Sequence, residues 1–97
     1  MGQEQKVELP QDLDMLYAEQ LKTQLLEALD GDEPIVLQGS AVGRVSSSCI
    51  QVIFAAAQSA KEQGRTLELQ ASSDVLAEAF IDLGLEPEFQ EWSNGDA

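Results

Sequence analysis

The amino-acid sequence predicts a small α/β domain in which helices pack against a short mixed sheet, and three observations lead to this expectation. The chain has 97 residues, enough for one hydrophobic core. Short segments with the two-residue period of a strand alternate with longer segments whose apolar residues have helical spacing. Apolar residues make up 43% of the chain, which argues against disorder even at a net charge of −13. We therefore expect one domain over residues 1–97, with loose ends at residues 1–5 and 90–97.

The first strand and the first helix are expected within residues 6–29. Val7 and Leu9 alternate with charged residues and a proline follows, as in a brief strand. Asp12 and Asp14 offer caps to a helix over residues 15–29. The inward stripe of this helix is predicted from its apolar residues Tyr17, Leu21, Leu25 and Ala28, widened by Ala18, Leu26 and Leu29.

Two more strands and a second helix are expected in the middle of the chain. Residues 34–38 form an apolar run that is typical of a buried strand. A helix is predicted from about Ser48 to Gln63, because apolar residues recur there at helical spacing and Gly64 can end the helix. Residues 66–70 alternate between apolar and polar side chains, which indicates another strand.

A third helix and an acidic tail complete the chain. Residues 72–74 offer capping side chains to the helix. Its predicted apolar stripe consists of Val75, Leu76, Ala79, Phe80 and Leu83. Gly84 ends the helix, and the tail that follows carries Phe89 and Trp92, which either pack on the domain or form a docking segment.

Acidic residues are absent from residues 34–60, although the whole chain holds 18 acidic and 5 basic residues. Arg44 is the single charged residue in this stretch. Burial accounts for the expected strand and helix, but not for the small uncharged residues of the loop at 39–48. Such residues leave backbone amides approachable, so we predict that this loop is a contact surface.

Several kinds of chemistry are excluded by what the sequence lacks. The chain has no histidine, which rules out Ser–His and Cys–His nucleophile pairs and the usual zinc sites. It contains neither a phosphate-binding loop motif nor a dinucleotide-binding motif, and residues 30–33 lack the spacing of an EF-hand. We therefore predict a protein that is not an enzyme and that binds no cofactor or metal ion.

Charge and cysteine content bound the partners and the compartment. A net charge of −13 disfavours binding to DNA, RNA and anionic membranes. The single cysteine, Cys49, cannot form an internal disulfide, and no apolar run is long enough to span a membrane. The first residues also lack the apolar core of a signal peptide, so we expect a cytoplasmic protein that binds another protein.

Three serines and a cysteine stand at the expected start of the second helix. One of Ser46, Ser47 and Ser48 should cap the helix, and a phosphate on one of them would be tolerated there because helix N-termini favour anions. Cys49 has two interpretations, a thiol activated by the helix dipole or a small buried side chain. Burial is the expected state, since unpaired cysteine is among the most buried residue types.

In their order and spacing these segments resemble the STAS domain, the fold of the anti-sigma factor antagonists. The segments that carry the resemblance are Val7–Pro10 with Leu13-Asp14, the strand Pro34–Leu37, the stretch Val45–Ile50 in place of the signature loop, the helix end at Ala60–Arg65, and Leu83-Gly84-Leu85. Together they cover most of the chain. Within the family, the chain is most similar to the small stand-alone STAS proteins of bacterial chemotaxis gene clusters.

The resemblance assigns roles to the loop and also shows departures from the family pattern. Ser47 matches the serine that the family phosphorylates, and Ser48 matches the residue after it. Ser46 stands where the family usually has aspartate, Cys49 replaces a glycine, and Gln38-Gly39 replaces an acidic residue. The resemblance therefore implies Ser47 as the candidate phosphoacceptor.

A partner-binding function follows from the resemblance. It implies a signalling module whose partner is a histidine kinase or an anti-sigma factor kinase. The predicted partner-binding residues are Ser40, Arg44, Val45, Ser46, Ser47, Ser48 and Gln51.

Two alternatives stay open. The chain is also similar to the STAS subunit of a phospholipid-transport ATPase complex that maintains lipid asymmetry, where the same surface would be permanently occupied. Alternatively, it is an acidic decoy for a basic partner and uses the outer faces of its helices. The acidic residues expected on those faces are Glu19, Glu27, Glu78 and Asp82.

Overall fold

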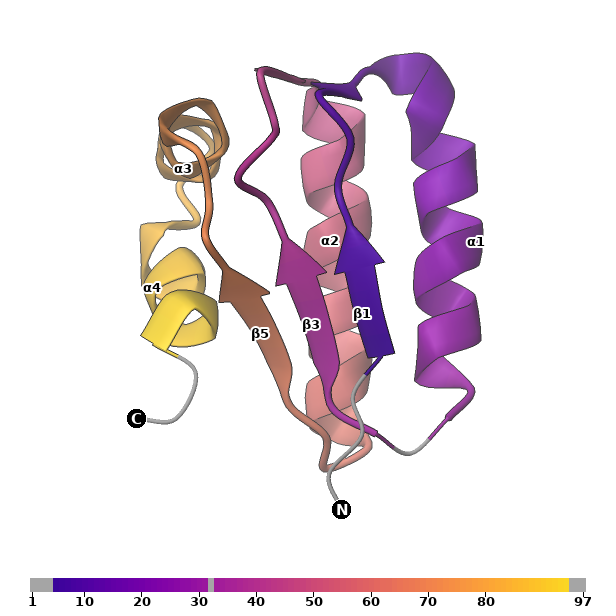
Figure 1. Cartoon of the computed structure of the whole chain (residues 1–97). Coiled ribbons are helices and arrows are strands. Elements are labelled where there is room, and N and C mark those ends of the chain that lie inside the picture. Colours follow the sequence, from indigo (N-terminus) through magenta and orange to yellow (C-terminus); the bar gives the residue numbers. More distant parts are fainter. Residues whose placement is uncertain (1–4, 32, 95–97) are drawn as a thin grey trace.

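A three-stranded parallel sheet forms the centre of the computed structural model, which describes residues 5–31 and 33–94. The strands are β1 (Gln5–Glu8), β3 (Ile35–Gln38) and β5 (Leu67–Gln70), with β3 in the middle (Figure 1). The expected α/β class is confirmed. The sheet differs from the expected mixed sheet, because every pairing among the described strands is parallel. Between consecutive strands of this sheet, a helix returns the chain to the end of the sheet where the previous strand began. The next strand therefore runs parallel to the previous one.

A second, two-stranded pairing was not predicted from the sequence. Strand β2 (Asp12–Leu13) pairs in parallel with β4 (Arg44–Val45), with Leu13 opposite Val45. The backbone N–H of Ser46 continues this pairing by donating to the Leu13 carbonyl at 2.7 Å. Two-residue strands are too short to show a period in the sequence. The pairing joins the segment after β1 to the segment before the second helix.

Two helices pack side by side against the sheet. A 3-10 turn, η1 (Met15–Tyr17), leads into α1 (Ala18–Leu29), and α2 (Ser47–Glu62) follows β4. The contact between α1 and α2 is the most extensive between two helices. In Figure 1, α2 runs behind the sheet, α1 lies beside it, and both run in the same direction after their parallel strands.

The buried core lies between these two helices, the sheet and the helices at the β5 edge. Its largest fully buried side chains are Phe80, Leu13, Leu21, Leu25, Ile35, Leu37, Ile50, Ile53 and Leu76. Three residues of the predicted inward stripes are instead exposed: Leu26, Val75 and Leu83. Leu26 and Val75 directly follow or precede a buried position, and neighbours along a helix are about 100° apart around its axis, so they face away from the core. Leu83 lies just beyond the end of α3.

The C-terminal part of the chain forms two short helices beside β5 (Figure 1), α3 (Asp74–Asp82) and α4 (Glu86–Asn94). Ser73 caps α3 by accepting from the backbone N–H of Leu76. Residues 90–94, expected as a loose end, are helical because α4 carries two aromatic side chains that pack on the domain. Trp92 is 7% exposed and meets Phe80 edge to face at 5.4 Å, while Phe89 stacks on Phe80 at 5.5 Å. Gln5 is likewise part of β1, and residues 1–4 and 95–97 lie outside the described residues.

Arg65, which lies just after α2, forms hydrogen bonds to the C-terminal end of α1. Its Nη2 donates to the carbonyls of Ala28 at 2.8 Å and Glu33 at 2.6 Å, and its Nη1 donates to the carbonyl of Leu29 at 2.7 Å. The last carbonyls of a helix have no partner within the helix and carry partial negative charge. Arg65 therefore adds a charged donor to these carbonyls, of which that of Ala28 also accepts from the Gly31 N–H at 3.3 Å. Gly64, directly before Arg65, has a φ of +74°, in the left-handed region that favours glycine after a helix.

Candidate functional site

The N-terminal end of α2 is built by Ser46, which caps the helix. Ser46 has extended backbone angles, φ −98° and ψ 156°, and its Oγ accepts from the backbone N–H of Cys49 at 3.4 Å. The helix thus begins at Ser47, one residue earlier than expected. Of the three candidate serines, Ser46 is the cap because its backbone is fixed by the bond to Leu13. This use of Ser46 leaves the next two serines available for other roles.

The residues of the first turn of α2 differ in exposure. Ser47 and Gln51 are exposed, whereas Ser48 is half-buried. Within the described residues, the Ser47 hydroxyl and the Gln51 amide make no hydrogen bond. Their polar groups are therefore free to bind a second molecule.

Arg44 and Val45 reach the same region from β4. Arg44 is opposite Asp12 in the β2–β4 pairing and is exposed, and its guanidinium forms no ion pair with any residue that the structure describes. Val45 is half-buried and packs against the core, so its contribution to a surface is small. Arg44 is a free cation near the start of α2.

Ser40 lies apart from the other predicted binding residues. It is exposed and lines a small hollow with Lys6, Glu8 and Leu9 beside β1. Ser48 and Gln51 instead line a different hollow, between α1 and α2. The structure therefore brings together the predicted residues from Arg44 to Gln51 and leaves Ser40 outside this group.

Several backbone amides of the loop are taken up by hydrogen bonds within the fold, contrary to the sequence-based expectation that they are approachable. The N–H groups of Gly43 and Arg44 both donate to the Gln11 carbonyl, at 2.8 and 3.1 Å. Gly39 donates to the Gln70 carbonyl, and its own carbonyl accepts from Ser73. These partners come from segments distant in sequence, which is why the loop residues alone did not reveal them. The amides of Gly39, Gly43 and Arg44 are therefore not available to a partner.

Cys49 is a core residue, as expected. It is fully buried, and its Sγ donates to the Asp14 carbonyl at 3.3 Å. Burial raises the pKa of the Cys49 thiol, the hydrogen bond with Ser46 lowers it, and the negative charge of Asp14 raises it further. The thiol is therefore neutral at pH 7 and has none of the character of a nucleophile.

Asp14 is an acidic residue that lies near this end of α2. From the residues alone, it was expected only to cap the helix that follows it. It does cap η1, since Oδ1 accepts from the backbone N–H of Tyr17 at 3.0 Å. Its contact with Cys49 also places it beside the first turn of α2. The loop that is free of acidic residues in sequence thus has an acidic neighbour in space. The signal available in the sequence was the Leu13-Asp14 pair.

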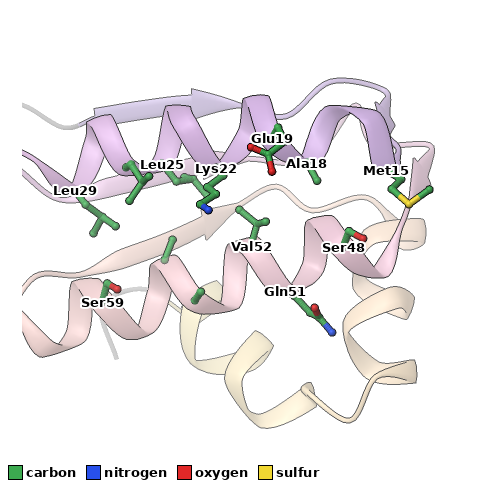
Figure 2. A pocket seen from close by; sticks show the side chains of 13 residues that line it. Met15, Ala18, Glu19, Lys22, Leu25, Leu29, Ser48, Gln51, Val52 and Ser59 are labelled. Atoms are coloured by element: carbon green, nitrogen blue, oxygen red, sulfur yellow. The ribbon is translucent and has the colours of Figure 1, made fainter.

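An apolar groove runs between α1 and α2, with a volume of about 540 Å³. Figure 2 shows Lys22, Leu25 and Leu29 reaching from α1 toward α2, and Val52 reaching from α2 toward α1. Two large apolar side chains on its α1 side are well exposed, Met15 at 69% and Leu26 at 55%. The groove was missed because Leu26 was assigned to the inward stripe. Ser48 and Gln51 belong both to the first turn of α2 and to this groove.

Two further properties concern only the part of the chain that the structure describes. No group of three or more His, Cys, Asp or Glu side chains there is placed to hold a metal ion. No helix there combines the length and the hydrophobicity needed to cross a membrane.

A family model described as "Mlab, STAS domain" matches residues 1–89. The chain belongs to the STAS domain family. STAS domains are commonly protein-interaction or regulatory modules and are typically not catalytic. A search of curated protein sequences gave no significant match.

A solved structure shows the same STAS fold. It is the crystal structure of a sulfate transporter family protein from Wolinella succinogenes, with a TM-score of 0.77 and 19% sequence identity. The match covers 93% of this chain and 75% of that chain. At this identity the likeness establishes the fold of the STAS domain and leaves its partner to be inferred from the surface.

Proposed function

We propose that this STAS domain is a non-enzymatic signalling module that binds a histidine kinase or an anti-sigma factor kinase through the start of α2. The observation that carries the proposal is the set of free polar side chains there. Ser47, Gln51 and Arg44 are exposed, and within the described residues their side chains form no hydrogen bond or ion pair. Polar groups without a partner inside the protein can exchange their bonds to water for bonds to a partner, with no loss of a bond that holds the fold.

Phosphorylation of Ser47 would switch this binding. Ser47 is the first residue of α2, where free amides and the helix dipole favour an anion, so the fold would tolerate the phosphate. The phosphate would add about −1.5 to −2 charges beside Asp14 and close to Arg44. A partner that fits the neutral surface would then meet a strongly anionic one. The fold would persist while the interface changes.

A subunit of a membrane transporter assembly is the second candidate function. It is supported by the similar solved structure, which is described as a sulfate transporter family protein. The resemblance to the STAS subunit of a phospholipid-transport ATPase complex points the same way. In this case the surface at the start of α2 would be permanently covered, and Ser47 would not be modified.

Ser47→Asp tests the signalling function directly. The tagged chain and the variant would be used to capture partners from the native bacterial lysate, with captured proteins and phosphosites identified by mass spectrometry. Ser93→Asp in α4 is the matched control, because it makes the same charge change at an exposed serine on another helix. Ser47→Asp should leave the melting temperature within a few degrees of wild type, because an acid is compatible with a helix start.

The proteins captured decide between the candidates. Loss of a histidine kinase or anti-sigma factor kinase with Ser47→Asp, and its retention with Ser93→Asp, is the result that we expect. Transporter subunits held equally by all three forms would favour the second candidate. A kinase bound equally by all three forms would remove Ser47 from the interface. An acidic decoy that uses its outer helix faces would instead lose its partner steeply as salt is raised.

A further inference from the structure

We propose that the groove between α1 and α2 binds an amphipathic helix of the partner protein, with apolar side chains in the groove and Lys or Arg on the flanks of that helix. This inference rests on the proposed function, since it names the structure that the same partner would present. The groove would form the second half of one interface, and the start of α2 would form the first half.

The composition of the groove favours an apolar occupant. Met15 and Leu26 expose large apolar side chains on the α1 side, and Val52 is half-buried on the α2 side. Such side chains gain free energy when a partner removes them from water. Of the large apolar side chains that are exposed among the described residues, only Met15 and Leu26 line this groove; the others are Leu16, Val75, Ile81 and Leu83.

The shape of the groove favours a helix as the occupant. It follows two neighbouring helices that run in the same direction, and α1 alone, with 12 residues, is about 18 Å long. Small residues, Ala55, Ala56 and Ser59, line its α2 side. A rod-shaped segment that lies between two helix ridges can therefore approach closely along several turns.

The charge of the chain favours a helix with basic flanks and disfavours other occupants of the groove. The lining holds one acid, Glu19, and one base, Lys22, so the groove itself is balanced. The whole chain has a net charge of −13, so a second copy of the chain or an anionic lipid surface would be repelled. A segment with basic flanks would be attracted at long range and could pair with Glu19.

Continuity links the groove to the start of α2. Ser48 and Gln51 lie in the first turn of α2 and also line the groove. Met15, directly after Asp14, lines the same end. A helix of the partner protein that lies in the groove would therefore end beside Ser47. The rest of the partner protein could then contact the polar side chains of Ser47, Gln51 and Arg44.

Site-specific photo-crosslinking in the native host tests the occupant. A photoreactive amino acid would replace Leu26 in one form and Ile81 in a control form. Both residues are large, apolar and about half exposed, at 55% and 45%, but Ile81 lies on α3 and outside the groove. The crosslinked peptides would be sequenced by mass spectrometry. From Leu26 we expect a segment with helical apolar spacing and flanking Lys or Arg, from the same protein that Ser47→Asp loses.

Other crosslinking results would overturn the inference. A crosslink from Leu26 to a second copy of this chain or to lipid would name a different occupant. A yield from Leu26 no higher than that from Ile81 would mean that the groove is empty.

One combination of results separates the two proposals. If Leu26 crosslinks to a basic amphipathic helix but Ser47→Asp changes no binding, the inference about the groove holds and the proposed role of Ser47 fails.

The partner protein that crosslinking identifies would then be purified, and its affinity for variants of this chain gives a second, independent test. Leu26→Arg should weaken binding about tenfold or more, while Ile81→Arg should change it less than about twofold. Ala55→Arg, which places a long cation in the groove from an exposed position, should act like Leu26→Arg. Circular dichroism would confirm that each variant is folded. Wild-type affinity for both groove variants would overturn the inference even if Ser47→Asp abolishes binding.

Discussion

At its C-terminal end α2 leads into Arg65, whose guanidinium donates to three backbone carbonyls, whereas near its N-terminal end Arg44 has no ion-pair partner among the described residues. Trp92 adds a buried aromatic contact near the C-terminal end, on Phe54 and Phe80. The N-terminal end is held by the Ser46 cap and by backbone pairing with β2. One end of the helix uses its cation for the fold, and at the other end Arg44 forms no ion pair with any residue that the structure describes.

This difference teaches that the position of a basic residue in an acidic sequence is a poor guide to its role until its partners are known. Arg65 is half-buried and Arg44 is exposed, yet both are isolated basic residues in an acidic chain. What separates them is the presence of helix-terminal carbonyls within reach of Arg65. Such carbonyls attract a cation strongly because they have lost water and lack a helical partner.

The largest expected effect is at Arg65. Arg65→Ala should lower the free energy of unfolding by about 2 to 4 kcal/mol, because it removes the charged donor of three backbone carbonyls, those of Ala28, Leu29 and Glu33. Arg44→Ala should change it by less than about 0.5 kcal/mol. Urea denaturation followed by circular dichroism measures both. Equal losses for the two variants would erase the distinction between the two ends. Arg65→Lys, which keeps the charge but not the planar fork, should recover only part of the loss.

A smaller effect is expected within the N-terminal end. Ser46→Ala should lower the free energy of unfolding by about 1 kcal/mol, because the Cys49 N–H loses its side-chain acceptor, Ser46 Oγ, and keeps only the Ser46 carbonyl. Ser47→Ala should change it by less than about 0.5 kcal/mol, because the Ser47 side chain is exposed. Thermal unfolding of the two variants compares them directly. If Ser47→Ala were the more damaging of the two, the assignment of Ser46 as the cap would be wrong.

The smallest effect concerns the buried thiol at the same end. The pKa of Cys49 is raised in the folded chain above its ordinary value of 9.0, mainly by burial. Well below pH 9 the thiol is protonated in both the folded and the unfolded chain, so it adds no pH dependence there. As pH rises further, the unfolded thiol loses its proton first, and the stability of the folded chain falls.

Cys49→Ala isolates this contribution, because the variant lacks the thiol but keeps every other titrating group. The difference in unfolding free energy between wild type and Cys49→Ala should therefore shrink between pH 8 and pH 10, as measured by urea denaturation. A difference that is constant over this range would mean that the thiol is not buried as the structure places it.

Much of the fold could be predicted because it depends on local patterns. The apolar run at β3 and the helical spacing in α1 and α2 reflect which face each element buries, and that is written in the residues of the element itself. The same holds for the start of α2, which was predicted to within one residue because capping serines favour helix N-termini. Residues 90–97 were expected to be loose because chain termini commonly are, and packing of Phe89 and Trp92 on the domain was one of two interpretations of the tail; in the structure Trp92 is buried within α4.

The candidate site was predicted only in part. Arg44, Ser47 and Gln51 were identified from a stretch without acids and from the family resemblance, and the structure gathers them at one end of α2. Asp14 and the groove beside Leu26 were not identified. A residue's spatial neighbours from distant segments leave no periodic signal in its own segment, so they could not be read from local spacing.

The sequence by itself determined the alternation of strands and helices, the acidic surface and the capping residues, because propensity, periodicity and charge act within a few residues of each other. Only the tertiary structure decided the parallel pairing of β2 with β4, the partners of Arg65 and the opening between α1 and α2. These features depend on contacts between residues more than 30 positions apart, such as Arg65 with Leu29, 36 residues away. Such contacts form when helices and strands pack, and that packing decides which side chains serve the fold and which remain free to bind a partner.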